Sequence, residues 1–169
     1  AKDARIGLNV DAEEANRLDL SLDVIEAVLE DPALAGWDGF GVVVQAYGPR
    51  AGAVIDWLAA TATRLNRRLM VRLVKGAYWD SEIKAAQVEG LAGFPVFTSK
   101  AATDISYIAN ARRLLGHADH LYPQFATHNA HTVSAVLHMA REMGLGPEAY
   151  EFQRLHGMGE ALHDTLKRE

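Results

Sequence analysis

Short apolar runs alternate along this chain with longer segments whose apolar residues recur at a helical spacing. The run 41–46 (Gly-Val-Val-Val-Gln-Ala) is uninterrupted until Gln45, as is typical of a parallel strand buried on both faces. The segment 18–30 has apolar residues on one side of a helix: Leu18, Leu22, Ile25 and Leu29. Regular alternation of the two patterns predicts an α/β fold with a parallel sheet and right-handed crossovers.

The alternation continues to the end of the chain and gives five β/α units without a linker. The predicted strands are 5–11, 41–46, 68–75, 121–127 and 151–155. The predicted helices are 18–30, 51–66, one that starts at 80–82 with a capping residue and an acidic first turn, 103–115, 132–143 and a short one near 159. The buried stripe expected for the helix 103–115 is Ile105, Ile108 and Leu115.

Two parallel-sheet architectures fit this alternation, namely a doubly wound sheet and a (β/α)8 barrel. No glycine-rich phosphate loop follows the first strand, so the dinucleotide-binding form of the doubly wound sheet is disfavoured. A complete barrel usually needs about 250 residues, and this chain has 169. We therefore expect a partial TIM-type barrel of about five β/α units, with strands missing at one or both ends and with exposed, poorly stable sheet edges.

Composition limits the classes of partner and of site. The formal net charge is −5, without a basic stripe, which argues against contact with nucleic acid. The absence of cysteine excludes disulfides and cysteine-ligated metal sites, and it fits a reducing compartment. No apolar run reaches the length of about 18 residues that a membrane span requires.

The third predicted strand carries two cations, Arg72 and Lys75, in an otherwise apolar segment. Burial of a charge is costly unless a partner or a ligand neutralises it. Two interpretations stay open at this point. The cations form a structural network with Asp11 or Asp80, or they face a ligand at the carboxyl end of the strand, where α/β proteins usually place their chemistry. The Gly-Ala pair at 76–77 would let such a ligand approach the backbone closely.

Four histidines flank the predicted strand 121–127 as two pairs, His117 with His120 and His128 with His131. Their spacing is compatible with zinc, with Asp104 or Asp119 as a further ligand. Because the two pairs lie at opposite ends of one strand, we expect no metal site. A metal-dependent barrel lyase or hydrolase that uses the histidines remains an alternative function.

Three longer motifs are more specific than the alternation. They are Arg-Leu-Val-Lys-Gly-Ala-Tyr-Trp-Asp at 72–80, Phe-Ala-Thr-His-Asn-Ala-His at 125–131 and Glu-Phe-Gln-Arg-Leu-His-Gly-Met-Gly at 151–159. Together with Gly-Leu-Asn-Val-Asp-Ala-Glu-Glu-Ala at 7–15, they resemble the proline dehydrogenase domain of the bacterial proline utilization A flavoenzymes, over essentially the whole chain. The resemblance implies a (β/α)8 barrel that holds FAD at the carboxyl ends of its strands, with the five strands here as the second to the sixth.

The resemblance also implies roles for individual residues. The implied catalytic and substrate-pocket residues are Arg72, Asp11, Ala77 and Leu155. The implied FAD contacts are Gln45, Arg72, Val74, Gly76, Ala77, Thr98, Lys100, His128 and Asn129. A fixed cation near the flavin ring stabilises its electron-rich form, which is the role implied for Arg72. The family's clamp for the proline carboxylate, a lysine, an arginine pair and a tyrosine, falls in segments that this chain does not contain.

The implied reaction is the FAD-dependent oxidation of L-proline to Δ1-pyrroline-5-carboxylate, with electrons passed to a quinone. The implied context is a larger polypeptide with an aldehyde dehydrogenase domain. It is expected in the cytoplasm, with peripheral association at the inner membrane surface as an open alternative. A further alternative is that residues 1–169 alone are an inactive structural portion of that larger enzyme.

Overall fold

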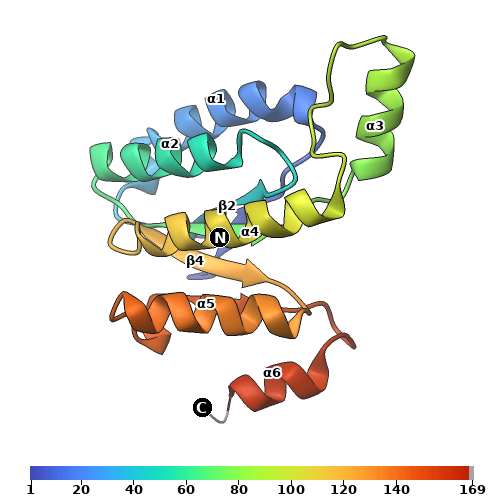
Figure 1. Ribbon diagram of the computed structural model, residues 1–169. Coiled ribbons are helices and arrows are strands. Elements are labelled where there is room, and N and C mark those ends of the chain that lie inside the picture. The colour runs from blue at the N-terminus through green and yellow to red at the C-terminus, as the bar shows by residue number, and fades with distance from the viewer. Residues whose placement is uncertain (168–169) are drawn as a thin grey trace.

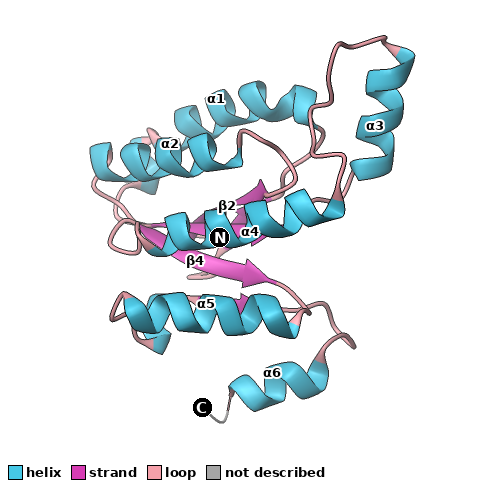
Figure 2. Ribbon diagram, in the orientation of Figure 1, coloured by secondary structure: helices cyan, strands magenta, loops and turns pink. Residues whose placement is uncertain are grey.

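Five parallel strands form a single sheet in the computed structural model, which describes residues 1–167 (Figures 1 and 2). The strands are β1 (Leu8–Val10), β2 (Phe40–Gln45), β3 (Leu69–Val74), β4 (Leu121–Ala126) and β5 (Glu151–Gln153). Each strand pairs in parallel with the next one along the chain. The expected α/β class and the expected parallel sheet are therefore confirmed.

Helices follow the strands and cover one face of the sheet. They are α1 (Leu18–Leu29), α2 (Ala51–Arg64), α3 (Trp79–Val88), α4 (Lys100–Leu115), α5 (Ala130–Glu142) and α6 (Glu160–Leu166), with short 3-10 turns at Ala15–Arg17, Pro32–Leu34 and Pro147–Ala149. In Figure 1, α1, α2, α4 and α5 lie side by side, and α3 stands apart on the side to which the strand arrows point. Sequential parallel strands joined by crossovers of one hand produce this one-sided layer.

Ion pairs connect neighbouring helices on their outer side. Arg64 of α2 contacts Glu26 of α1 and Glu30, the residue after α1, and Arg113 of α4 contacts Asp56 of α2. Ion pairs therefore connect neighbouring helices, although exposed pairs of this kind contribute little to stability and apolar burial dominates. No helix in the described part of the chain has the length and apolar character needed to cross a membrane.

Side chains of the three central strands alternate between two environments. One set is fully buried between the sheet and the helices and comprises Val42, Val44, Leu69, Val71, Leu73, Leu121, Pro123 and Phe125. The other set points to the opposite face and is only partly covered at most of its positions. On that opposite face, Val43, Arg72, Gln124 and Glu151 are in register across four strands. Arg72 therefore belongs to the inner face of the sheet, away from the helices.

Tyr107 of α4 joins the helical layer to the ends of two strands. Its side chain is 1% exposed, and its hydroxyl lies 3.2 Å from the carbonyl oxygen of Leu73 and 3.3 Å from that of Ala126. Burial raises the pKa of this phenol. Because Leu73 and Ala126 lie at the carboxyl ends of β3 and β4, the hydroxyl helps to set the spacing of those two ends.

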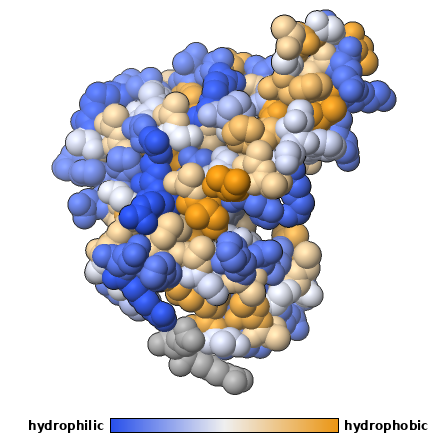
Figure 3. All heavy atoms as spheres, viewed as in Figure 1, coloured by the Kyte–Doolittle hydropathy of each residue, from blue (hydrophilic) through white to orange (hydrophobic). Residues whose placement is uncertain are grey.

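The expected face of the helix 103–115 is partly wrong. The helix begins at Lys100, and Ile105, expected in the buried stripe, is 71% exposed. Leu115 is buried as expected, and Ile108 is partly buried against the core. Tyr107, Ala111 and Leu114 complete the buried side. Two residues turn an α-helix by about 200°, so the burial of Tyr107 directs Ile105 outward. Figure 3 shows apolar side chains on the helical face in the region of α4.

The first strand, expected over 5–11, is limited to Leu8–Val10. Two boundaries at the carboxyl end of the sheet also differ. The helix expected to start at a capping residue in 80–82 starts at Trp79 and has no side-chain cap. The last strand ends at Gln153, so Leu155 lies in the loop that follows. In both places the chain leaves the sheet at its carboxyl end, where tertiary contacts outweigh local propensity.

Both outer strands have one strand neighbour within residues 1–167. Beside β1, an open groove of about 700 Å³ is lined by apolar side chains of β1 and α1. Among them, Leu20 is 67% exposed and Val24 is 54% exposed. The expected open sheet edges are present, and the edge at β1 carries an apolar surface with no cover in the described part of the chain.

The Tyr107→Phe substitution tests the link between α4 and the strand ends. We expect the free energy of unfolding of the full-length protein to fall by about 1 kcal/mol, because two carbonyl oxygens lose their shared donor. The unfolded phenol ionises near its ordinary pKa of 10.0, whereas the folded phenol, whose pKa is raised, does so at higher pH. Wild-type stability should therefore decline as pH rises above 10, and the Phe variant should lack this part of the decline. Urea midpoints across that pH range measure both effects, and equal midpoints for the two proteins would contradict them.

Candidate active site

A hollow of about 960 Å³ lies at the carboxyl end of the sheet and receives residues from all five strand ends. Ten of the eleven site residues implied by the sequence line it, and they are Asp11, Gln45, Arg72, Val74, Gly76, Ala77, Lys100, His128, Asn129 and Leu155. The eleventh, Thr98, lines an adjoining hollow of about 450 Å³ together with Lys75, Gly76 and Lys100. The fold thus gathers the implied residues at one edge, although their individual roles stay predictions.

Arg72 supplies the cation on the inner face of the sheet. Its Nη1 donates a hydrogen bond to Asp11 Oδ1 over 3.1 Å, which is one of the pairings that the structural-network interpretation allowed. The Arg72 side chain is 27% exposed, whereas that of Asp11 is 79% exposed. Arg72 Nε is buried without a hydrogen-bond partner in residues 1–167. The guanidinium therefore retains donor capacity beyond this one ion pair.

Lys75 pairs with Asp104, and not with Asp11 or Asp80 as the structural-network interpretation would have it. Its Nζ lies 2.5 Å from Asp104 Oδ1, and Lys100 Nζ lies 2.7 Å from Asp104 Oδ2. Hydrogen bonds from Lys100 and Lys75 lower the pKa of the Asp104 carboxyl, and the bond to Asp104 raises the pKa of Lys100. Asp104 reaches both lysines because α4 begins at residue 100 and brings its first turn against the end of β3.

Gln45 joins two of the loops around the hollow. Its Nε2 donates to the carbonyl oxygen of Glu13 over 2.8 Å, and its Oε1 accepts the backbone N–H of Ala77 over 3.0 Å. The expected partners for a partly buried amide are therefore backbone groups of this chain. One N–H and one acceptor position of the amide remain available, so the predicted contact to a flavin ring is compatible with this arrangement and stays a prediction.

Gly76 is required by the geometry of the turn after β3. Its φ is +141°, and a Cβ at this position would collide with the ring of Tyr47. Tyr47 is itself buried, and desolvation raises its pKa to about 12. Glycine therefore lets the backbone at 76–77 pass close to an immobile ring and leaves the edge of the hollow free of a side chain.

The segment that leaves β4 is held by three side-chain contacts. Asn129 caps α5, because its Oδ1 accepts the Thr132 backbone N–H over 3.0 Å. His128 Nε2 accepts the backbone N–H of Leu155 over 3.0 Å. His163, 6% exposed, places its Nε2 3.0 Å from the carbonyl oxygen of Thr127. Asn129 and His128 thus have structural contacts in addition to the cofactor roles predicted for them.

A polar layer beside Arg72 was missed by the sequence reasoning. Gln124 Nε2 donates to Glu151 Oε1 over 2.9 Å, and Gln153 Nε2 donates to the same oxygen over 2.6 Å. Asn9 Nδ2 lies 3.4 Å from Gln124 Oε1 and extends the layer to β1. The available signal was Gln124 itself, a polar residue in the middle of a buried strand, which requires polar neighbours on its face.

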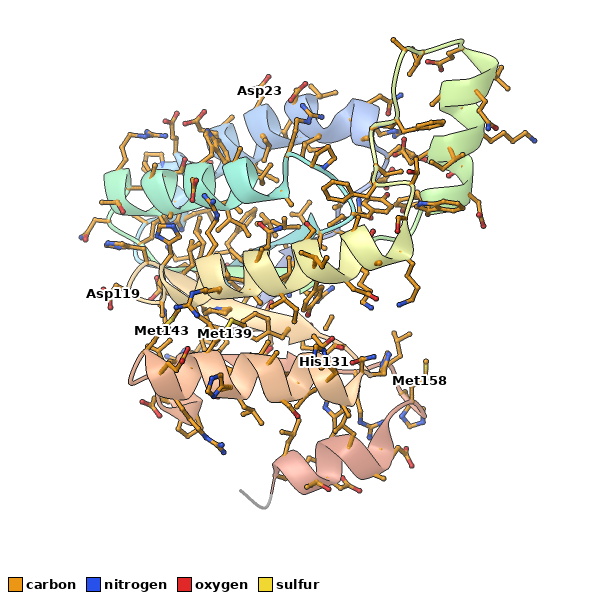
Figure 4. The ribbon with its side chains drawn as sticks, viewed as in Figure 1. Asp23, Asp119, His131, Met139, Met143 and Met158 are labelled. Carbon is orange, nitrogen blue, oxygen red and sulfur yellow. The ribbon has the colours of Figure 1, made fainter. Side chains whose placement is uncertain are left out.

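The two histidine pairs do not meet. His117 and His120 precede β4, and His128 and His131 follow it, as expected. In Figure 4, Asp119 and His131 lie at opposite ends of the molecule's helical layer. No three His, Asp or Glu side chains in residues 1–167 lie close enough to hold a metal ion. The described part of the chain therefore offers no ligand set for the metal-dependent alternative.

The His128→Ala substitution tests the contact that positions Leu155. Loss of the ring acceptor should speed hydrogen exchange of the Leu155 amide by about tenfold, the equivalent of one ordinary hydrogen bond. His131→Ala is the matched control, because His131 is an exposed residue of the same segment. Amide exchange followed by mass spectrometry on overlapping peptides measures the effect. Equal exchange at Leu155 in both variants would show that the contact does not order the loop.

Comparison with known proteins shows the family of this chain. The family model described as proline dehydrogenase matches residues 1–169. The bifunctional protein PutA of Salmonella typhimurium is 58% identical over 166 residues, which is 98% of this chain and 12% of that protein. Proline dehydrogenase 2 of Bacillus subtilis (strain 168) is 30% identical over 171 residues and is covered to 48% of its length.

Solved structures give the same result. Proline utilization A from Bradyrhizobium japonicum superimposes with a TM-score of 0.95 at 60% identity, over 99% of this chain and 17% of that one. The enzyme from Bdellovibrio bacteriovorus, inactivated by N-propargylglycine, gives a TM-score of 0.91 at 34% identity, over 96% and 17% of the two chains. The chain thus spans about one eighth of the PutA sequence from Salmonella typhimurium. It belongs to the proline dehydrogenase family.

Proposed function

We propose that this chain forms part of an enzyme that oxidises L-proline to Δ1-pyrroline-5-carboxylate with FAD and passes the electrons to a quinone. The observation that carries the proposal is the Arg72 guanidinium, which lines the hollow and has a buried Nε with no partner in residues 1–167. A cation with donor capacity left over, at the carboxyl end of a parallel sheet, matches the need to stabilise negative charge that develops on a reacting group.

The residues around the hollow fit a flavin dinucleotide. The turn at Gly76 leaves the backbone open to close approach, and Lys75 and Lys100 supply positive charge where a diphosphate would need it. Bound FAD would supply the hydride-accepting ring. Arg72 would stabilise the charge on that ring, and Asp11 would hold the guanidinium in place. Gln45, Val74, Ala77, Thr98, His128 and Asn129 are the further contacts that we assign to the cofactor.

For the substrate, this chain offers an apolar wall. Leu155 is 65% exposed in the hollow, and the bond from its N–H to His128 holds it there. The relative from Bdellovibrio bacteriovorus is inactivated by N-propargylglycine, an amino acid with a secondary amine, as in proline. The family resemblance implies that the clamp for the proline carboxylate lies in segments outside residues 1–169, and we assign it there.

We further propose that the sheet is an arc of a (β/α)8 barrel, completed by other segments of a longer polypeptide. The groove beside β1, lined by exposed side chains such as Leu20 and Val24, is the surface that a preceding β/α unit would cover. The protein would then be inactive as residues 1–169 alone. An aldehyde dehydrogenase domain in the same polypeptide, a cytoplasmic location and peripheral contact with the membrane belong to the same proposal.

The first test is spectroscopic. The full-length protein, purified gently, should show the absorbance bands of a flavin, and anaerobic addition of L-proline should bleach them. D-proline is the control, because a site with a fixed apolar wall and a cationic clamp selects one enantiomer. Oxidised quinone should then restore the bands. A protein that carries no flavin and takes up none would contradict the proposal.

The second test concerns Arg72. The Arg72→Met variant keeps an unbranched apolar stem of similar length but loses the charge, so the flavin potential should become more negative and proline-dependent reduction should slow by about 100-fold. Arg112→Met, which removes a cation from the outer surface of α4, should leave both quantities unchanged. Spectroelectrochemistry and single-turnover reduction measure them. A wild-type potential in Arg72→Met would refute the assigned role.

A further inference from the structure

Asp104 contacts two lysines from different elements at the edge of the hollow. Lys75 follows β3, and Lys100 is the first residue of α4. Each lysine contacts a different oxygen of the carboxylate, at 2.5 Å and 2.7 Å. A single acidic side chain therefore sets the distance between two ammonium groups. Both lysines line the two adjoining hollows, whereas Asp104 lines neither of them.

We propose that Asp104 is a positioning residue, which holds Lys75 and Lys100 together as a clamp for the diphosphate group of a bound dinucleotide. The inference rests on the proposed function, which puts FAD in this hollow. It extends that function to a residue that does not itself touch the cofactor. Asp104 would act through the two lysines alone.

Electrostatics explains why such a residue is needed. Two ammonium groups held close together repel one another, and the more mobile of them would turn toward solvent. The Lys100 side chain is 79% exposed and has the room to do so. With the carboxylate between them, the group of three carries a net charge of +1 and both lysines stay in place. A diphosphate then meets two cations whose rotamer entropy has already been lost.

The charge states agree with this arrangement. The pKa of Asp104 is lowered by its bonds to Lys100 and Lys75, so the carboxylate is ionised at neutral pH. The contribution of these ion pairs is present above the ordinary carboxyl pKa of 3.8 and is lost as pH falls through the lowered value. Across the neutral range the carboxylate that joins the two lysines is therefore ionised.

A negative charge could instead oppose a bound anion. That view predicts the opposite change in affinity, because removal of Asp104 would tighten the binding of a diphosphate. The geometry favours positioning, since both carboxylate oxygens already face an ammonium group and their field toward the hollow is largely cancelled. The two views are therefore distinguished by the direction of one affinity change.

The test compares Asp104→Asn with a matched control in the full-length protein. Asp56→Asn is the control, because Asp56 also bridges two basic side chains, Arg113 and His117, but on the outer surface of the helices. FAD, ADP and riboflavin are titrated into flavin-free protein, and dissociation constants are measured by flavin fluorescence and calorimetry. Riboflavin lacks the diphosphate and reports on the ring site alone.

We expect Asp104→Asn to weaken FAD and ADP by about tenfold, the equivalent of one charge-assisted hydrogen bond. Riboflavin affinity should not change, and Asp104→Glu should restore part of the loss. The salt dependence of FAD binding should become shallower, since fewer cations face the diphosphate. Asp56→Asn should behave as wild type in every titration.

Unchanged or tighter binding of FAD and ADP to Asp104→Asn would overturn the inference and leave the proposed function intact. Equal weakening of riboflavin would also overturn it, because the substitution would then disturb the whole hollow. If wild-type protein binds ADP in an Asp104-dependent way but not FAD, the inference stands and the flavin proposal fails. If wild-type protein binds neither ADP nor FAD, both fail.

Discussion

The incomplete compensation of Arg72 is the constraint around which this site is organised. The guanidinium lies on the inner face of the sheet, yet its ion-pair partner, Asp11, is 79% exposed and is therefore well screened by solvent. A partly buried cation whose ion-pair partner is exposed to solvent is incompletely compensated, and this is costly. Arg72 lies where β3 reaches the hollow, next to the polar layer of Gln124 and Glu151. The protein thus keeps a cation with unused hydrogen-bond donors at this position, as the role proposed for Arg72 would require.

The loops around this cation are joined to one another by side chains. Gln45 links the loop after β1 to the turn after β3. Glu82 of α3, which is 7% exposed, accepts the backbone N–H of Ala15 and holds the same first loop from the other side. Trp79 Nε1 donates to the carbonyl oxygen of Phe97 over 2.9 Å and joins the start of α3 to the loop before α4. Such connections keep a site in one geometry before any ligand arrives, which reduces the entropy lost on binding. These contacts of α3 are with loops around the hollow, in agreement with its position apart from the helical layer.

The sequence predicts those parts of the structure that follow from periodicity. The parallel sheet, the order of its elements and the gathering of Asp11, Gln45 and Arg72 at one edge depend on strand ends, and strand ends can be read from apolar runs. The partner of Lys75 could not be read in this way. Asp104 is 29 residues away, and its reach depends on where α4 starts, whereas helix boundaries are the least predictable part of a pattern. The exposure of Ile105 and the short last strand were missed because tertiary packing decides which side of α4 is buried and where β5 ends.

Under the proposed function, the division of the site between this chain and the rest of the protein follows from barrel geometry. Consecutive strands supply a continuous arc of the barrel's mouth, which is the end of the barrel where the hollow lies. An extended ligand that lies along the arc therefore contacts consecutive strand ends. Gln45, Arg72 and His128 come from three such ends, as the contacts of a dinucleotide would. A small substrate stacked on the ring must be enclosed from the opposite side, and its clamp must then come from strands across the mouth. An arc of five strands can therefore hold most of a cofactor site and only one wall of a substrate site, and the proposed function assigns that combination to residues 1–167.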